Sequence, residues 1–144
     1  MKLGAGFLIA CPNTQKILLA LRNDSEPVWS IFGGTVENQE TPIQCAKREL
    51  IEEAGFIEDR DYKIVSNHPI FIGKYVNFMY RTFLCVSEQE VIPTLNYEHL
   101  DYKWVALDEI PNNRHFGLQG LMADPKAMRK LSYMLNSKTG GNNG

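Results

Sequence analysis

The sequence is poor in cysteine, and the placement of the few cysteines excludes several classes of protein. Its 144 residues include only Cys11, Cys45 and Cys85, which lie far apart and form no C-x-x-C pair. An odd number of widely spaced thiols argues against both a disulfide framework and a zinc site. We therefore expect a reducing, cytoplasmic environment, with the cysteines serving as small apolar side chains.

Long apolar runs and an excess of positive charge are also missing. No stretch approaches the ~20 apolar residues that a membrane-spanning helix requires. The net charge of −2 provides no general attraction to nucleic acid or to an anionic membrane. We expect no membrane partner, and the chain carries no strong nucleic-acid signal.

Internal repeats and low-complexity linkers are absent too. The hydrophobic content of 44% and the charged content of 22% are ordinary for a globular protein. A chain of this length has room for one core. We predict a single domain over residues 1–136, followed by a flexible tail over residues 137–144, where glycine and asparagine accumulate.

Apolar runs and turn residues indicate a mixture of strands and helices. Residues 4–11 and 16–22 flank the turn sequence PNTQ and predict a β-hairpin, and residues 28–32 predict a short strand that stops at Gly33-Gly34. Further strands are expected at 69–73, 75–86 and 102–107, and one or two helices, broken near Pro125, at 118–135. Such a mixture in one compact chain indicates an α/β or α+β class.

Residues 42–54 carry a full set of helix signals. Thr41 can cap the N-terminus, Pro42 suits the first helical position, and Gln44 completes a capping box. Gly55 suits the left-handed position that ends a helix. We therefore predict a helix from Pro42 to Ala54.

This helix presents two faces of different character. Ile43, Ala46, Leu50 and Ala54 recur at helical spacing and predict the buried face. The carboxylates of Glu49, Glu52 and Glu53 share a second face beside it, where like charges repel one another. A hard divalent cation would remove that repulsion, because it prefers carboxylate oxygen. The alternative is a solvated acidic face on which Arg48 pairs with Glu52.

The residues around the glutamates favour the cation. Residues 34–56, GTVENQETPIQCAKRELIEEAGF, place nine residues at fixed spacing: Gly34, Glu40, Arg48, Glu49, Leu50, Glu52, Glu53, Gly55 and Phe56. The segment resembles the Nudix box, G-x5-E-x7-R-E-U-x-E-E-x-G-U, in which U is bulky and apolar. A chance match is on the order of one in 10⁹ per start position. One departure is Phe32, where the family usually has proline.

The resemblance implies a fold and a metal site. It implies an α/β/α sandwich around a mixed β-sheet, with Mg²⁺, or Mn²⁺ in its place, held by a loop–helix–loop. Glu49, Glu52 and Glu53 would be metal ligands, often joined by the Gly34 carbonyl. Glu40 would pair with Arg48 and brace the loop, and we expect Arg48 to project away from the metal face.

A further carboxylate is expected from the loop before the strand at 102–107. Members of the Nudix family often draw an acid from this part of the chain, and Glu98 is the candidate here. Glu98 would serve as an outer metal ligand or as the general base, a role for which Glu52 is the other contender. The alternative is an ordinary loop acid.

Several residues are candidates for contacts with substrate. Arg22 ends the second strand and can hold a phosphate by a bidentate contact, although it equally suits the surface. Trp29 and Tyr97, like Phe71 and Tyr80, can stack on a nucleobase or belong to the core or rim. His115 lies in the segment NNRHFGL, which we expect at the edge of the pocket.

The resemblance implies an enzyme. The expected reaction is Mg²⁺-dependent hydrolysis of a phosphoanhydride in a nucleoside diphosphate linked to X, such as a nucleoside triphosphate, ADP-ribose, a dinucleoside polyphosphate or a nucleotide sugar. The alternatives are a Nudix-fold sensor that binds a nucleotide without cleaving it, and a pyrophosphohydrolase acting on RNA 5′ ends. An isoprenoid diphosphate isomerase would need an extra cysteine and a longer chain. The oligomeric state is open, and homodimers are common among relatives.

Overall fold

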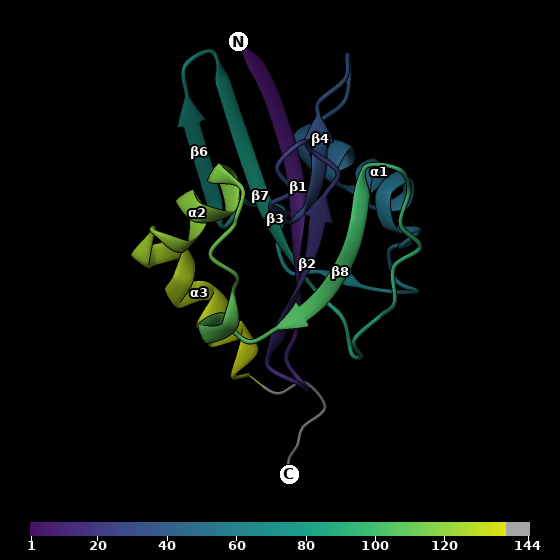
Figure 1. The fold of residues 1–144 in the computed structure, drawn as a ribbon, viewed down its shortest axis with the longest axis vertical. Coiled ribbons are helices and arrows are strands. Elements are labelled where there is room, and N and C mark those ends of the chain that lie inside the picture. The colour runs from purple at the N-terminus through teal and green to yellow at the C-terminus, as the bar shows by residue number, and fades with distance from the viewer. Residues whose placement is uncertain (138–144) are drawn as a thin grey trace.

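A computed structural model describes residues 1–137 and has the α/β/α architecture expected from the sequence (Figure 1). The expected tail lies, apart from Ser137, outside the described residues. The strands are β1 (Lys2–Cys11), β2 (Lys16–Arg22), β3 (Trp29–Ser30), β4 (Phe32–Thr35), β5 (Lys63–Ile64), β6 (Phe71–Tyr75), β7 (Phe78–Val86) and β8 (His99–Val105). The helices are α1 (Pro42–Ala54), α2 (Phe116–Met122) and α3 (Pro125–Leu135), with a 3-10 turn at Leu107–Glu109.

The central sheet is mixed, and β1 changes its antiparallel partner partway along its length. Strands β1 and β7 run parallel, whereas the other pairings are antiparallel. Strand β1 pairs with β2 only at Ala10 and Cys11, and its earlier half, Gly4 to Phe7, pairs with β4 instead. The sheet therefore divides between β2 and β4, and the end of β2, the start of β8 and all of β4 border the division.

Helix α1 covers one face of the sheet and has the predicted bounds. Thr41 and Gln44 form the predicted capping box, and Gly55 ends the helix at φ 73°. Ala46, Leu50 and Ala54 are buried against Phe7, Phe83 and other apolar residues of the sheet, with Ile43 packed at the margin. The predicted apolar face is confirmed.

Helices α2 and α3 cover the opposite face (Figure 1). Leu118, Leu121 and Leu131 pack there on Leu8 and Leu19 of the sheet. The predicted break near Pro125 is confirmed, because Asp124 caps α3 and Pro125 takes its first turn. No helix within residues 1–137 is long and apolar enough to cross a membrane.

Several strand predictions were wrong in their bounds, and the strand predicted over 75–86 is interrupted, because Tyr75 ends β6, a turn follows, and β7 begins at Phe78. The chain does not stop being a strand at Gly33-Gly34: after a break at Ile31 it continues as β4 through both glycines to Thr35, because β1 supplies a partner for them. Strand β8 begins at His99, earlier than the predicted 102, because Arg22 at the end of β2 pairs with it there. Both extensions lead the chain towards the division in the sheet.

Candidate active site

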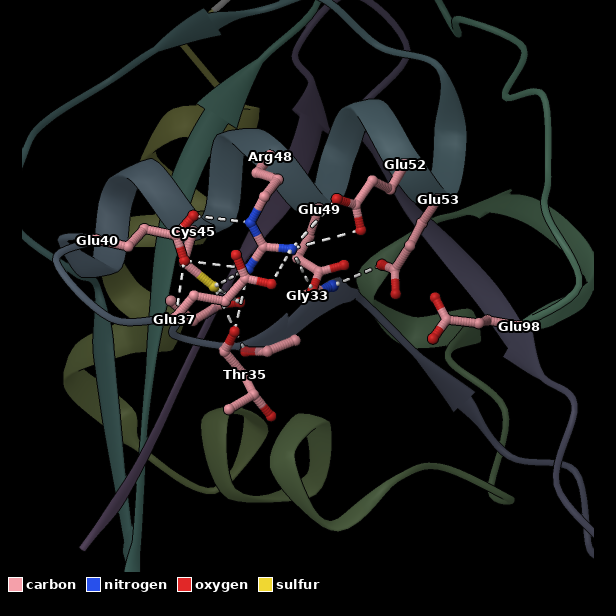
Figure 2. Close-up of polar contacts among 12 residues, drawn as sticks. Gly33, Thr35, Glu37, Glu40, Cys45, Arg48, Glu49, Glu52, Glu53 and Glu98 are labelled. Atoms are coloured by element: carbon pink, nitrogen blue, oxygen red, sulfur yellow. Dashed lines mark hydrogen bonds and ion pairs between the residues drawn. The ribbon is translucent and has the colours of Figure 1, made fainter.

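Three carboxylates meet at the division between β2 and β4 (Figure 2). Glu49 and Glu53 come from α1 and Glu98 from the loop before β8, and each offers an oxygen within 4.8 Å of the other two. The first two are buried, with residue exposures of 8% and 4%, whereas Glu98 is exposed. We call these three residues the carboxylate cluster.

The electrostatics of the carboxylate cluster are unfavourable without a cation. Burial raises the pKa of Glu53 to about 9, and the carboxylates of Glu98 and Glu49 add to that rise. Burial also raises the pKa of Glu49, although Arg48 opposes the shift. The basic side chains nearby do not compensate the charge of these buried carboxylates, and the carboxylate oxygens can reach one point. Such a group suits a hard divalent ion such as Mg²⁺.

Two glycines of β4 lie against the carboxylate cluster. The Gly33 amide donates a 2.9 Å hydrogen bond to Glu53 Oε1. A Cβ at Gly34 would collide with the carboxylate of Glu49, so the glycine leaves room for that carboxylate in its present position. The carbonyl of Gly34, a predicted ligand, accepts a 3.6 Å contact from the Cys45 thiol.

Arg48 binds a second set of carboxylates beside the cluster (Figure 2). Its Nε and Nη2 donate to the two oxygens of Glu40 at 2.7 and 3.0 Å, which confirms the predicted pair. That bidentate contact lowers the pKa of Glu40 to about 2. The Nη2 atom also donates to the Thr35 carbonyl at 3.1 Å and thereby joins α1 to the end of β4.

The prediction that Arg48 projects away from the metal face was wrong. Its Nη1 lies 3.3 Å from Glu49 Oε2 and 3.3 Å from Glu52 Oε2. The long side chain follows the helix surface to the nearest carboxylates, so the guanidinium bridges the loop and the cluster. Glu52 has a side chain that is 51% exposed, and the structure does not bring it into the cluster. Its predicted roles as ligand or base stay predictions.

Asn96 is a site residue that the sequence reasoning missed. Its side-chain amide donates to the Glu52 carbonyl at 3.0 Å, and its Oδ1 accepts from the Glu98 amide at 3.0 Å. These bonds fasten the loop of Glu98 to α1. An asparagine two residues before the acid is a local turn signal, and it could have been recognised in the sequence.

Two cavities that share part of their lining lie on this side of the sheet. The larger, about 900 Å³, contains the cluster together with Arg22, Asp24 and Tyr97. The smaller, about 210 Å³, lies between β4, the β6–β7 hairpin and α2. Both are lined by Arg22, Ile31, Gly33, Gly34 and Thr35. We call them the acidic cavity and the aromatic cavity.

Three of the four predicted substrate residues line these cavities. Arg22 lines both cavities and is held by Asp24 at 2.7 Å, Tyr97 is 83% exposed at the acidic cavity, and His115 lines the aromatic cavity. Trp29 lines neither cavity. It is 8% exposed within the core, with Lys103 Nζ 4.5 Å from its ring.

The fold, the box and the cluster agree with a comparison to known protein families. Residues 2–124 match the NUDIX domain. The chain therefore belongs to the Nudix hydrolase family, and it is an enzyme of that family, a pyrophosphohydrolase.

Two curated relatives each align with about two thirds or more of this chain. A dihydroneopterin triphosphate diphosphatase of Haemophilus influenzae is 33% identical over 112 residues, covering 69% of this chain and 70% of its own length. An oxidized purine nucleoside triphosphate hydrolase of Mus musculus is 31% identical, covering 72% and 67%. An RNA pyrophosphohydrolase of Helicobacter pylori is 34% identical but covers only 43% and 38%.

Among solved structures, the Ap4A hydrolase of C. elegans has the same fold. The two superpose with a TM-score of 0.75, covering 94% of this chain and 99% of the other, at 22% identity. This likeness supports the α/β/α sandwich and carries no information on substrate.

Proposed function

We propose that the protein hydrolyses a phosphoanhydride bond of a nucleotide with Mg²⁺, or Mn²⁺, held by Glu49 and Glu53, with Glu98 beside them as the general base. The observation that supports this is the carboxylate cluster, which is partly buried and opens into the acidic cavity. A protein that only bound a nucleotide would not need buried carboxylates with so little compensation. For this reason we favour an enzyme over a sensor.

The residues of the chain divide the work of the reaction. A metal ion held by these carboxylates would offset the negative charge of the phosphate oxygens. Arg22 leaves Asp24 and binds a phosphate, so that its positive charge stabilises the negative charge of the transition state. Glu98 accepts a proton from the attacking water, because its loop position lets it reach the water while Glu49 and Glu53 stay fixed on α1.

The substrate class that we propose is a nucleoside triphosphate or a related heterocyclic triphosphate. The names of the two relatives that span about two thirds or more of this chain both describe triphosphates. ADP-ribose, dinucleoside polyphosphates and nucleotide sugars are therefore second choices. A 5′-triphosphate on RNA shares the same phosphate chemistry, but the relatives that act on it match less than half of this chain.

A substrate panel tests the proposal. The purified chain is assayed with nucleoside triphosphates, ADP-ribose, a dinucleoside tetraphosphate and a nucleotide sugar, with Mg²⁺ or with EDTA, and the products are identified. Activity should require the metal and should be greatest with a triphosphate. Glu58→Gln is the control, because Glu58 pairs with Lys47 at 3.0 Å outside both cavities. Metal-independent activity, or none on any substrate, would overturn the proposal.

A further inference from the structure

The loop that carries Glu98 reaches the carboxylate cluster from outside α1 (Figure 2). Glu98 is exposed, whereas Glu49 and Glu53 are buried on the helix. A general base must lie within hydrogen-bond reach of the proton that it accepts, and an exposed side chain on a loop has many orientations to choose from. The position of Glu98 therefore depends on the contacts that hold its backbone.

Asn96 joins this loop to α1 and to the carboxylate itself. Its Oδ1 accepts a hydrogen bond from the Glu98 amide at 3.0 Å. Its Nδ2 donates to the Glu52 carbonyl at 3.0 Å and lies 3.5 Å from Glu98 Oε2. Glu52 belongs to the last turn of α1. One side chain thus sets the distance between the backbone of Glu98 and the helix that carries the other carboxylates.

Asn23 joins the same loop to the end of β2. Its backbone amide donates to the Glu98 carbonyl at 2.9 Å, and its side-chain amide donates to the Tyr97 carbonyl at 3.0 Å. Asn23 directly follows Arg22, which lines both cavities. The residue that holds the loop of Glu98 is therefore the neighbour of the arginine that we propose to bind phosphate.

A β-bulge at the start of β8 directs the loop towards α1. Leu21 pairs with Asp101, but Arg22 pairs with His99, so that Leu100 is an extra residue on β8. In a regular strand His99 would share the face of Asp101, because alternate residues point the same way. The bulge turns His99 to the α1 face, where its ring lies 5.1 Å from that of Phe32. Bulges of this kind re-aim side chains beside active sites.

From these contacts we propose that Asn23 and Asn96 are positioning residues, which hold the general base Glu98 in one geometry relative to α1 and to the end of β2. The inference rests on the proposed function, which makes Glu98 the base. Asn96 fixes the loop against the helix, and Asn23 fixes it against the strand that ends in Arg22. A phosphate bound at Arg22 and a water beside Glu98 consequently keep a constant separation, which an in-line attack requires.

Steady-state kinetics with Mg²⁺ and the best substrate of the panel, GTP if triphosphates are preferred, tests each asparagine. Asn96→Ala should lower kcat about tenfold and leave KM within about threefold, because the base moves while the phosphate contacts stay. Asn96→Ser should fall between it and the parent, because a hydroxyl still accepts from the Glu98 amide but is too short for the Glu52 carbonyl. Asn23→Ala should lower kcat about threefold, since its backbone amide is unchanged.

A double-substitution cycle separates positioning of the base from a general loss of structure. Once Glu98→Gln has removed the base, adding Asn96→Ala should lower kcat by less than about twofold, because no base is left to position. A further loss of about tenfold would show that Asn96 acts through another group, and it would overturn the inference. Asn13→Ala is the matched control and should leave kcat unchanged. The Asn13 side chain also donates to a loop carbonyl, that of Glu88 at 2.8 Å, but it lies outside both cavities.

The outcomes distinguish this inference from the proposed function. If the parent is active and both Asn96→Ala and Asn23→Ala match it, the inference fails and the hydrolase assignment stands. If Glu98→Gln keeps the kcat of the parent, the base assignment fails and the inference fails with it. If nothing in the panel is hydrolysed, the proposed function fails, and amide hydrogen exchange still tests the positioning of the loop. Exchange at Glu98 that is about tenfold faster in Asn96→Ala than in Asn13→Ala supports that positioning, and equal exchange overturns it.

Discussion

Two sets of carboxylates at and around α1 differ in which groups compensate their charge. Glu40 and Glu52 meet Arg48, and the pKa of Glu40 is lowered to about 2. Glu53, the residue after Glu52, meets Glu49 and Glu98 instead, and its pKa is raised to about 9. Arg48 compensates the charge of the first set, whereas a bound cation would be needed to compensate the charge of the second.

The difference separates carboxylates that stabilise the fold from carboxylates that remain available to bind a ligand. A carboxylate whose charge is already compensated stabilises the fold and has little affinity left for a ligand. A buried carboxylate without compensation costs stability, and it recovers that cost when a cation binds. Arg48 stands at the border, because it contacts both Glu40 and Glu49. Substitutions in the pair of Glu40 and Arg48 should therefore lower stability, whereas substitutions in the carboxylate cluster should lower activity.

Glu53→Gln should have the largest effect, and it should affect activity alone. The amide keeps the shape of the side chain but supplies one ligand charge fewer, so we expect kcat/KM to fall about 10³-fold, or about 4 kcal/mol of transition-state stabilisation. The thermal melting temperature in EDTA should not fall, because the amide keeps the shape of the side chain and its oxygen can still accept the hydrogen bond from the Gly33 amide. Glu58→Gln is the control. An activity within threefold of the parent would contradict the metal role of Glu53.

Glu98→Gln should lower kcat by about 10²-fold or more and leave KM within a few-fold. Proton transfer to a base occurs only as the transition state forms, and general-base catalysis contributes about 10²–10⁴-fold. The measurement is steady-state kinetics beside Glu52→Gln, the other contender for the base. A larger loss of kcat in the Glu52 variant, with Glu98→Gln near normal, would assign the base to Glu52.

Arg48→Ala should weaken the fold as well as the rate. The substitution leaves Glu40 without its partner, and breaking such a pair from one side costs roughly 3–5 kcal/mol when it is buried. Because the side chain of Arg48 is 24% exposed, we expect the lower end, about 3 kcal/mol, in urea unfolding. Arg48→Lys should fall between, because lysine keeps the charge but not the bidentate contact. An unchanged unfolding midpoint would make Arg48 an ordinary surface residue.

The smallest predicted effect is a pH dependence that belongs to Glu40. Its folded-state pKa of about 2 lies below the ordinary value of 4.5. The stability that this shift contributes is therefore fully present above pH 4.5 and is lost as the pH falls towards 2. Parent and Glu40→Gln should differ most in unfolding free energy near neutral pH, and the gap should narrow between pH 4.5 and 2. A constant gap would show that the pair with Arg48 is not the cause.

The sequence predicted the elements whose signals are local. Helix α1 has its expected bounds because Thr41, Gln44 and Gly55 act on their own neighbours. The pair of Glu40 and Arg48 followed from the resemblance to the Nudix box. The box also marked Glu49 and Glu53, and the structure brings them together with Glu98.

Features that depend on long-range partners were missed or misjudged. Strand β4 exists at Gly33-Gly34 only because β1 pairs with it across the sheet, and no local preference favours glycine in a strand. Trp29 was a candidate for stacking, but its surroundings in the core come from residues distant in sequence. The direction of the Arg48 side chain depends on the competing carboxylates of Glu49 and Glu52, whose positions helical spacing alone does not rank.

Because the sheet divides, the position of the carboxylate cluster depends on the first strand of the chain. The two glycines that hold the carboxylate cluster belong to β4, and the only strand beside β4 in residues 1–137 is the early half of β1, Gly4 to Phe7. A residue at the start of the chain thus sets the position of a backbone amide that orients Glu53. Shortening, tagging or loosening this first strand would therefore disturb the carboxylate cluster, even though none of Gly4 to Phe7 lines the acidic cavity.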